Sequence, residues 1–531
     1  MREERPLDIS ALCREFALAL TGQPSVTGSE DEVAFGPWLT DYLATHPALH
    51  RCNRSWCLPV RGSDQRQVVF LLAKGSTNGP TVVLTGHYDT VTTRDYGDLE
   101  HLALEPDRLK QALLEKLAAQ TSDAERLAFA DLKSGNFLPG RGLLDMKGGL
   151  AAGLAAMAAI SAEPFPGNLL FIAVPDEENA SAGARAAVEF LPSIANRENL
   201  DIKLVINLDA IADVGDGFEG QVLATGTVGK LLPTALVIGR PVHSGYATRG
   251  LNAAVLASAV AAKIEWAADL AEDSGTVPTL LSIKDSKTQY DVTTPATAFL
   301  FWNLLFKDRN PLELMAILQD LIAEAVGDCV QDLVERGRRL ESSDVELLDA
   351  HVPVLRFDQL LTQVEVEHPT IREMLAKISV SLKHLDAPER CRRLTLALWE
   401  KSGKSGPAVV FGLGADPYLS TAVRSPEVMN LLRAFVSQSE ARHGCSLRLV
   451  SHFAGISDMS FFGESVETYR RSLLPLCPTA SASHASAGTT YPTVNLGPWG
   501  RDYHTPLERI HVPYSFELLP QLIVDFVGEI G

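Results

Sequence analysis

The chain has 531 residues, of which 46% are hydrophobic, enough for a large core and roughly two or three domains. Its formal net charge of −19 repels polyanions, so we expect neither nucleic acid nor an anionic membrane as a partner. The seven cysteines are widely spaced and form no C-x-x-C pair, which argues against a thiolate metal site and suits a reducing compartment. Residues 1–6 lead into no signal-peptide core, so we expect a cytoplasmic protein.

Strand and helix patterns alternate in the first part of the chain. Short apolar runs predict buried strands at 67–73, 81–85, 168–174 and 202–208. Helical patterns lie among them at 146–160 and at 181–191, where Ser181 is the N-cap candidate. A long charged helical segment at 94–137 interrupts the alternation. This order predicts an α/β fold with a mixed, mostly parallel sheet, in which ligands bind at the carboxyl ends of strands.

The pattern changes near residue 215. The following segments predict an exposed antiparallel strand pair, a helix, a strand and a second helix, at 221–240, 251–272, 292–306 and 311–338. Strand signals return at 408–413, 446–452 and 493–496, after a charged helical segment at 341–406. We therefore expect one main domain built from 1–215 and 336–531, with an inserted two-layer α+β domain at 216–335.

Five segments place a histidine or carboxylate after an expected strand or before an expected helix. They are 84–91 with His87 and Asp89, 140–149 with Asp145, 174–179 with Glu177 and Glu178, 206–209 with Asp209, and 495–509 with His504. The carboxyl ends of parallel strands share one edge of a sheet, so these groups are expected to meet there. Nitrogen and oxygen donors without cysteine suit zinc, cobalt or manganese.

Each segment alone has a structural alternative. His87 and Asp89 also fit a structural ion pair, and Asp145 fits an ordinary helix N-cap. The acidic run at 176–178 also fits a solvated loop, although adjacent carboxylates repel one another unless cations or raised pKa values relieve them. The case for a metal site therefore depends on the five segments together.

In this order the segments resemble the superfamily of dinuclear zinc hydrolases that contains aminoacylases, glutamate carboxypeptidases and succinyl-diaminopimelate desuccinylases. The insertion at 94–137 and the segment 455–459 resemble its branch of arginine-utilisation proteins. The resemblance implies a zinc-exopeptidase-like main domain and two metal ions. The implied ligands of one zinc are His87, Asp145 and Asp209, and those of the other are Asp145, Glu178 and His504.

The resemblance also implies a reaction. Glu177 would act as general base on a water shared by the two zinc ions, and would pass the proton to the leaving amine. Asp89 would orient His87. The implied substrate is a small peptide or N-acyl amino acid, whose C–N amide bond is hydrolysed.

The inserted domain resembles the family's lid and dimerisation domain at 239–245 and 250–253. His243 would then reach a neighbouring active site across a homodimer and donate to the oxyanion; an ordinary surface histidine fits the same position. One departure concerns 299–304, which contains no arginine where the family often has one to bind a substrate carboxylate. This departure puts a free-carboxylate substrate in doubt.

Other motifs in the sequence give weaker evidence of function. The phosphate-loop-like run at 402–405 lacks the required earlier glycine, because Leu398 occupies that position. The sequence contains no G-x-S-x-G motif, which disfavours a serine hydrolase of that type. A catalytically idle scaffold is one alternative to an enzyme, and Glu177 argues against it because a binding scaffold needs no base beside the metals. A structural metal protein with closed coordination is another, and an absence of exchangeable water would support it.

Overall fold

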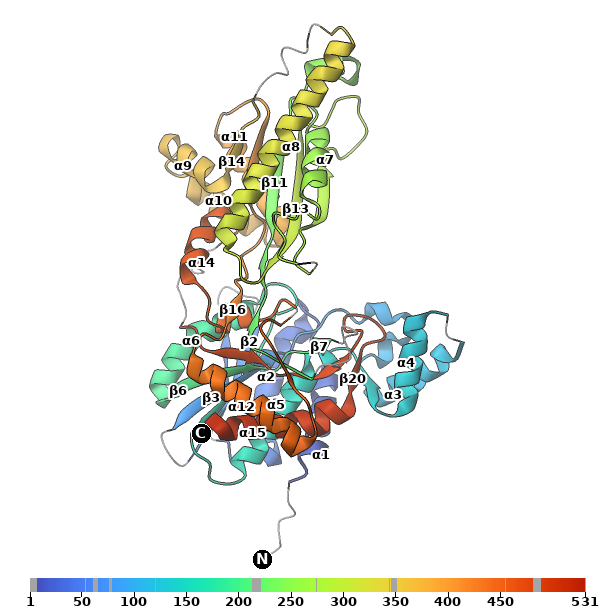
Figure 1. Ribbon diagram of the computed structural model, residues 1–531, viewed down its shortest axis with the longest axis vertical. Helices are drawn as coiled ribbons and strands as arrows, with labels where there is room; N and C mark the ends of the chain where they lie inside the picture. The colour runs from blue at the N-terminus through green and yellow to red at the C-terminus, as the bar shows by residue number, and fades with distance from the viewer. Residues whose placement is uncertain are drawn as a thin grey trace, which may run out of the picture. The chain divides into compact units, whose positions relative to one another are not determined.

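The computed structural model describes residues 7–52, 54–60, 65–75, 79–119, 121–212, 221–273, 275–342, 344, 351–453, 455–480 and 489–530. The chain divides into two compact units (Figure 1). The first unit contains Met1–Thr227, Thr421–Ser465 and Gly488–Gly531, and the second contains Val228–Ser420 and Val466–Ala487. The expectation drawn from residues 1–6 lies outside the described residues.

An eight-stranded mixed sheet forms the core of the first unit. Its strand order is β1 (Arg54–Pro59), β2 (Gln67–Lys74), β5 (Asn168–Val174), β3 (Pro80–His87), β6 (Asp201–Asn207), β18 (Thr493–Asn495), β8 (Val222–Ala224) and β17 (Arg448–Val450). The central strands β5, β3, β6 and β18 run parallel, whereas β1–β2, β2–β5 and β18–β8 are antiparallel. These strands confirm the predicted α/β fold, and they align the carboxyl ends of β3, β5 and β6 at one edge.

Helices cover both faces of this sheet. The helices of the first unit outside the insertion are α1 (Ile9–Gly22), α2 (Glu30–Thr45), α5 (Gly148–Ser161), α6 (Ala182–Glu198), α12 (Pro426–His443), α13 (Met459–Phe462) and α15 (Leu519–Ile530). Helix α5 packs between α1, α15 and the sheet and is buried almost all round, as expected for a helix that is apolar on every side. The stretch Leu143–Ser161 has the length and hydropathy of a membrane span, but 89% of it is buried inside this unit, as in a core helix.

The segment expected to be helical at 94–137 forms a small helical insertion between β3 and β4 (Phe137–Pro139). It contains η2 (Arg94–Leu102), α3 (Pro106–Lys116), η3 (Leu117–Ala119) and α4 (Asp123–Ser134). A reciprocal capping box between Ser122 and Glu125 starts α4, and Gly135 ends it in the left-handed conformation. Strand β4 then joins β20 (Arg509–His511), β19 (Trp499–Arg501) and β7 (Ile211–Ala212) in a four-stranded sheet.

The second unit is a helix-covered sheet. Its strands are β10 (Gly229–Leu231), β11 (Pro233–Ile238), β12 (Thr279–Asp285), β13 (Thr297–Phe306), β14 (Val354–Arg356) and β15 (Ala408–Leu413). Ala235 and Val237 face a core that includes α7 (Ala253–Ile264) and α8 (Pro311–Arg339), which gives the two layers expected from the sequence. Leu236 and Ile238 face the opposite way, against α9 (Phe357–Glu367), α10 (Ile371–Ser381) and α11 (Ala387–Lys401), which add a third layer.

The inserted unit is longer than the sequence suggested. The expected boundary at 215 lies outside the described residues, and the expected return to the main domain at 336 is replaced by a return at Thr421. The reason is strand pairing: β15, expected in the main domain, pairs with β11 of the inserted sheet, and the helices from 357 to 401 cover that sheet. Strand β11, expected to be exposed, is buried throughout because both of its faces are covered.

Candidate metal centre

Three groups converge where β3 and β6 end. His87 is the last residue of β3, and its Nε2 lies 3.1 Å from Asp145 Oδ1 and 3.8 Å from Asp209 Oδ1. Asp209 follows β6 by two residues. All three side chains are buried. Their ligand atoms lie within 4.8 Å of one another, close enough to surround a single ion.

A second group shares Asp145 with the first. His504 Nε2 lies 2.9 Å from Glu178 Oε1 and 3.2 Å from Asp145 Oδ2. The two oxygens of Asp145 therefore face the two groups separately, as a bridging carboxylate would. Geometry alone also groups His87 with Glu177 and Glu178, since Glu177 Oε2 lies 3.9 Å from His87 Nε2. Among the described residues the structure thus brings together six of the sequence-predicted site residues.

Asp145 does not act as a helix N-cap. Helix α5 starts three residues later at Gly148, its N-cap position is Lys147, and its described start has no side-chain cap hydrogen bond. Gly142 precedes Asp145 with a φ of 71°, a backbone conformation that glycine adopts without strain. The N-cap alternative is therefore wrong, and the loop aims the carboxylate at both histidines.

Asp89 supports the site differently from the sequence expectation. His87 Nδ1 lies 3.0 Å from the backbone oxygen of Asp89 and 3.7 Å from its carboxylate. The carboxylate instead accepts the backbone N–H groups of Glu177 and Glu178, at 3.1 and 3.2 Å, and the Thr27 hydroxyl at 2.9 Å. Burial raises the pKa of Asp89, and His87 and these donors oppose that shift. Asp89 thus holds the imidazole with its backbone and the acidic turn with its side chain.

Asn495 fixes Asp209, a role that the sequence did not suggest. Its Oδ1 accepts from the Asp209 backbone N–H at 3.2 Å, and its Nδ2 donates to the Asp209 carbonyl at 2.9 Å. Gly497 lies directly against the same carbonyl, where a Cβ atom would overlap the oxygen. The only sequence signal was the position of Asn495 at the end of a predicted strand.

Asp176 anchors the acidic turn after β5 through its side chain. Asp176 has a φ of 71°, accepts from Arg66 Nη1 at 2.5 Å, and accepts the Ala182 backbone N–H at 3.1 Å. Asp176 therefore caps the start of α6, and the expected Ser181 side-chain cap is absent. This arrangement leaves the next two residues, Glu177 and Glu178, directed at the histidines.

The site carries more buried negative charge than its histidines can offset. Burial and neighbouring carboxylates raise the pKa of Glu177 and Asp209, and burial raises that of Glu178 despite its bond to His504. Burial acts against ionisation of Asp145 as well, but its hydrogen bonds to both histidines hold its pKa below the ordinary value. Divalent cations would relieve this repulsion, and the oxygen and nitrogen donors fit them.

Asp458 is a further carboxylate near this cluster. It is 2% exposed, and its charge raises the pKa of Glu177. Burial raises the pKa of Asp458 to about 7, with the Ser181 hydroxyl close enough to oppose the shift. Ser457 anchors the segment by accepting from Asn207 Nδ2 at 2.9 Å. In the sequence, segment 455–459 indicates only the family resemblance and assigns no role to Asp458.

His243 belongs to the second unit. It is exposed, and its Nδ1 accepts from the Gly245 backbone N–H at 3.0 Å. The other predicted site residues all belong to the first unit. The role of His243 therefore stays a prediction.

Comparisons with known proteins place the chain in a family. A model of the peptidase family M20/M25/M40 matches residues 118–490. The protein YqjN of Bacillus subtilis is 30% identical over 521 residues, covering 95% of this chain and 94% of its own, and the protein RocB of the same organism is 26% identical over 534 residues, covering 95% and 92%. A succinyl-diaminopimelate desuccinylase of Rhodopseudomonas palustris is 25% identical over 276 residues, covering 50% and 62%.

Solved structures show the same fold at low identity. The aminopeptidase PepT of Bacillus cereus superimposes with a TM-score of 0.55 at 15% identity, covering 98% of each chain. The Bacillus subtilis YXEP protein, described as a dinuclear metal binding peptidase, gives a TM-score of 0.51 at 11% identity, again covering 98% of each chain. The family model and YqjN confirm the superfamily predicted from the sequence, and the solved structures confirm the fold class.

Proposed function

Since the chain belongs to peptidase family M20/M25/M40, and is therefore a metal-dependent hydrolase, we propose that it cleaves the amide bond of a small peptide or N-acyl amino acid. The observation that carries the proposal is the pair of ligand groups that share Asp145. We assign His87 and Asp209 to one ion, Glu178 and His504 to the other, and Asp145 to both. Zinc is the proposed metal, with cobalt and manganese as the alternatives to be tested.

Two bound divalent ions would supply Lewis acidity for the water and for the scissile carbonyl. Glu177 then acts as the general base. It takes a proton from the water as the water oxygen bonds to the carbonyl carbon, and it delivers that proton to the amide nitrogen as the C–N bond breaks. The hydrogen bonds from the backbone N–H groups of Glu177 and Glu178 to the Asp89 carboxylate support this assignment, because they fix the base beside the proposed ligands.

The lack of an arginine in β13 bears on which substrates the site can bind. The middle of this strand is Phe299–Leu304, without arginine, and Leu300, Trp302 and Leu304 are buried. A substrate carboxylate would have to find its cation elsewhere. One relative named above is a desuccinylase and two of the similar solved structures are peptidases, so the test panel should pair free-carboxylate substrates with their amides.

We further infer a homodimer formed through the second unit, with His243 donating to the oxyanion of a neighbouring site. The support is the edge strand β12, where Leu281 is 53% exposed and Ile283 is 45% exposed. Among the described strands β12 pairs only with β13, so its outer edge offers backbone groups as well as apolar surface. A cytoplasmic location is proposed on the seven cysteines, all of which are free.

The test is amine release from a panel of dipeptides and N-acyl amino acids by zinc-loaded protein, with metal content measured in parallel. Glu177→Gln should abolish turnover and keep two metals, while Glu163→Gln, at an exposed position two residues after the end of α5, should match the wild type in both readouts. Loss of one metal in Glu177→Gln would identify Glu177 as a ligand. Two metals with no turnover of any substrate would favour the idle-scaffold alternative.

A further inference from the structure

The helical insertion at 94–134 has no role in the reaction described above. We propose that it positions His504 for the second metal ion, through ion pairs between Asp131 of α4 and both arginines at the base of the His504 hairpin. The inference rests on the proposed two-metal site and adds residues that hold one of its ligands. It concerns the first unit alone.

His504 lies in a hairpin loop, in a backbone conformation that needs contacts from outside the hairpin. Strands β19 and β20 pair at Gly500–Ile510 and Arg501–Arg509, which leaves residues 502–508 as the loop. The His504 side chain is 40% exposed, and its φ of 61° is in the left-handed region that non-glycine residues rarely adopt. Asp502 has a similar φ of 57°. Such conformations persist only where surrounding contacts enforce them.

Asp131 supplies contacts to both sides of the hairpin base. Its carboxylate accepts from Arg501 Nη1 at 2.9 and 2.8 Å, and from Arg509 Nε and Nη2 at 2.9 and 2.7 Å. Arg509 is fully buried, so its charge depends on these partners. Each arginine belongs to one strand of the hairpin, and Asp131 therefore joins the two strands where the loop begins and ends.

Arg509 carries the contact into the loop. Its Nη1 donates to Asp502 Oδ2 at 2.6 Å and to the Leu507 carbonyl at 2.9 Å. These two acceptors lie on either side of His504 in the chain. One guanidinium group thus bonds at once to the insertion and to both arms of the loop that presents the metal ligand.

A second ion-pair cluster, of Arg141, Glu508 and Asp95, contacts the same loop. Arg141 Nη1 donates to Glu508 Oε2 at 2.7 Å, its Nη2 donates to Asp95 at 2.5 Å, and its Nε donates to the Thr92 carbonyl at 3.0 Å. Arg141 and Glu508 are both 1% exposed. Asp95 belongs to η2, so the insertion meets the His504 loop through this cluster as well as through Asp131.

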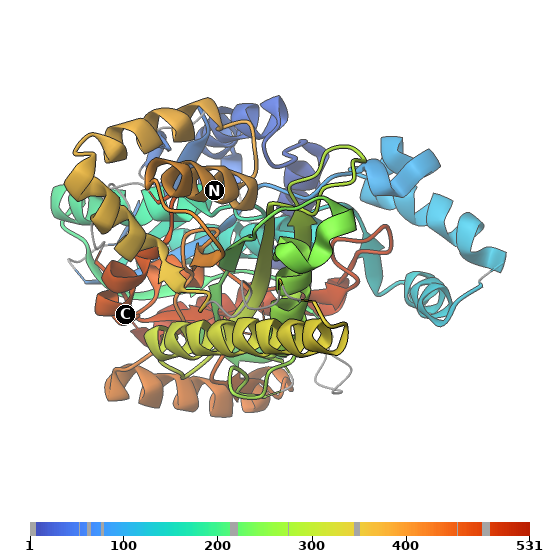
Figure 2. The ribbon, with the colours of Figure 1, turned by 90° about the horizontal axis from the view of Figure 1, so that it is seen from above.

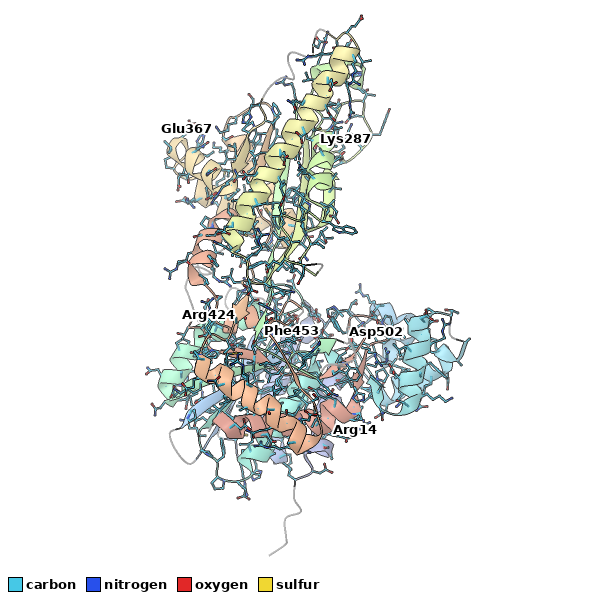
Figure 3. All side chains as sticks on the ribbon, in the orientation of Figure 1. Arg14, Lys287, Glu367, Arg424, Phe453 and Asp502 are labelled. Carbon is cyan, nitrogen blue, oxygen red and sulfur yellow. The ribbon has the colours of Figure 1, made fainter. Side chains whose placement is uncertain are left out.

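The pictures show the same neighbourhood. Helices α3 and α4 lie beside β20 in Figure 1, and the β19–β20 hairpin reaches toward them again in Figure 2. Strand β4, which leaves the insertion, pairs with β20 from Pro139 to Phe137. Figure 3 labels Asp502 on the side of the first unit that faces the insertion. The insertion is therefore attached to the hairpin by backbone pairing and by buried charge.

The experiment compares Asp131→Asn with Asp107→Asn, since Asp107 is an exposed acid of the same insertion that pairs with Arg14 of α1 and not with the hairpin. Zinc stoichiometry and affinity are measured by chelator competition, and the cobalt(II) absorption spectrum reports the second site. We expect Asp131→Asn to weaken one of two sites by about 10- to 100-fold, as removal of a ligand-supporting partner does elsewhere. Asp107→Asn should bind both ions as the wild type does.

A purely structural role of Asp131 would lower the melting temperature of the metal-free protein and leave both affinities unchanged, and that result overturns the inference. Wild-type protein that binds fewer than two ions overturns both the inference and the proposed function. Two ions bound equally by wild type and Asp131→Asn overturn the inference alone. Failure of the inference is therefore distinguishable from failure of the proposed function.

A second variant covers the case in which Asp131→Asn does not fold. Arg501→Gln leaves the Asp131–Arg509 pair in place, so the buried guanidinium keeps its counter-charge. We expect a smaller weakening of the same single site in this variant, with the circular dichroism spectrum of the wild type. Wild-type affinity at both sites in folded Arg501→Gln would contradict the inference.

Discussion

Replacing Asp89 by asparagine separates its two contacts with the site. The backbone carbonyl of Asp89, which lies 3.0 Å from His87 Nδ1, remains in the variant. The carboxylate, whose two oxygens accept the N–H groups of Glu177 and Glu178, becomes an amide with one oxygen. In either orientation of the amide, one of the two backbone N–H groups then faces an NH₂ group. The perturbation therefore affects the acidic turn and spares the histidine.

The magnitude follows from one charged hydrogen bond. Asp89 is fully buried, so no water replaces the lost acceptor. A hydrogen bond to a charged group contributes about 1.5–3 kcal/mol, and an unsatisfied buried donor costs a similar amount. If this loss appears in the placement of the general base, turnover falls by about 10- to 100-fold, since about 1.4 kcal/mol corresponds to a factor of ten. Both metal ions should stay bound because every proposed ligand is unchanged.

The assay measures kcat, KM and metal content of zinc-loaded Asp89→Asn with the best substrate of the panel. Thr27→Val is the matched control, because it removes the third bond to the same carboxylate, at 2.9 Å, and keeps both amide contacts. We expect the control to lose less than Asp89→Asn in kcat. We also expect KM to change little in both variants, because neither residue is assigned to substrate binding.

Two results would refute this reasoning. Full turnover in Asp89→Asn would show that the amide contacts do not position the base. Loss of the ion assigned to His87 would show that the carboxylate acts on the imidazole, as the sequence alone suggested. The second outcome would return Asp89 to the role implied by the family resemblance.

The remaining predictions address acid stability, metal and assembly. Burial and the nearby Arg501 lower the pKa of His511 to about 4, so as the pH falls from 6.5 to 4 the unfolded chain binds the proton before the folded one, and the free energy of unfolding decreases by up to about 3 kcal/mol. His511→Asn should reduce this decrease in urea unfolding, and an unchanged decrease would exclude His511 as its source. Chelation should lower the melting temperature, because each site contributes about 4 kcal/mol at 1,000 times its Kd; an unshifted transition would exclude tight sites. Leu281→Glu should dissociate the homodimer in sedimentation, and an unaltered dimer would place the interface elsewhere. His243→Ala should lower turnover with zinc content and dimer intact, whereas zinc loss would make it a ligand.

Four strands of the main sheet were predictable because they are mostly apolar on both faces. The run at 168–174 coincides with β5, and those at 67–73, 81–85 and 202–208 lie within a residue or two of β2, β3 and β6. Burial under helices requires such continuous apolar runs, and few other local structures produce them. The same argument holds for α5, whose alanine-rich sequence is buried almost all round.

The inserted unit was harder because its signals are not local. Strand β12 lies at a sheet edge with Leu281 and Ile283 exposed, so it lacks a simple inward–outward alternation, and a bulge between Leu280 and Ser282 shifts its register. The helices from 357 to 401 are amphipathic, and an amphipathic helix does not reveal which sheet it covers. The pairing of β15 with β11 joins segments about 170 residues apart. The boundary could therefore be found only from tertiary contacts.

The site shows the same division between local and distant information. Each candidate ligand follows closely on the end of its own strand, so His87, Glu178 and Asp209 could be proposed from short motifs read in order. The groups that aim those ligands come from other elements and need only be polar: Asn495 bonds to Asp209 across 286 residues, and Asp131 bonds to Arg509 across 378.

A polar residue of this supporting kind has the same sequence context as any surface or capping residue, because the contact that gives it a role is made by the fold. Asp89 illustrates the limit most clearly. The His-x-Asp spacing correctly placed it beside the imidazole, yet it could not show that the backbone oxygen serves His87 while the carboxylate serves a turn 88 residues away. Residue types predict ligands, whereas the positioning of those ligands depends on three-dimensional contacts, and variants of the supporting residues are therefore the sharper test of the proposed site.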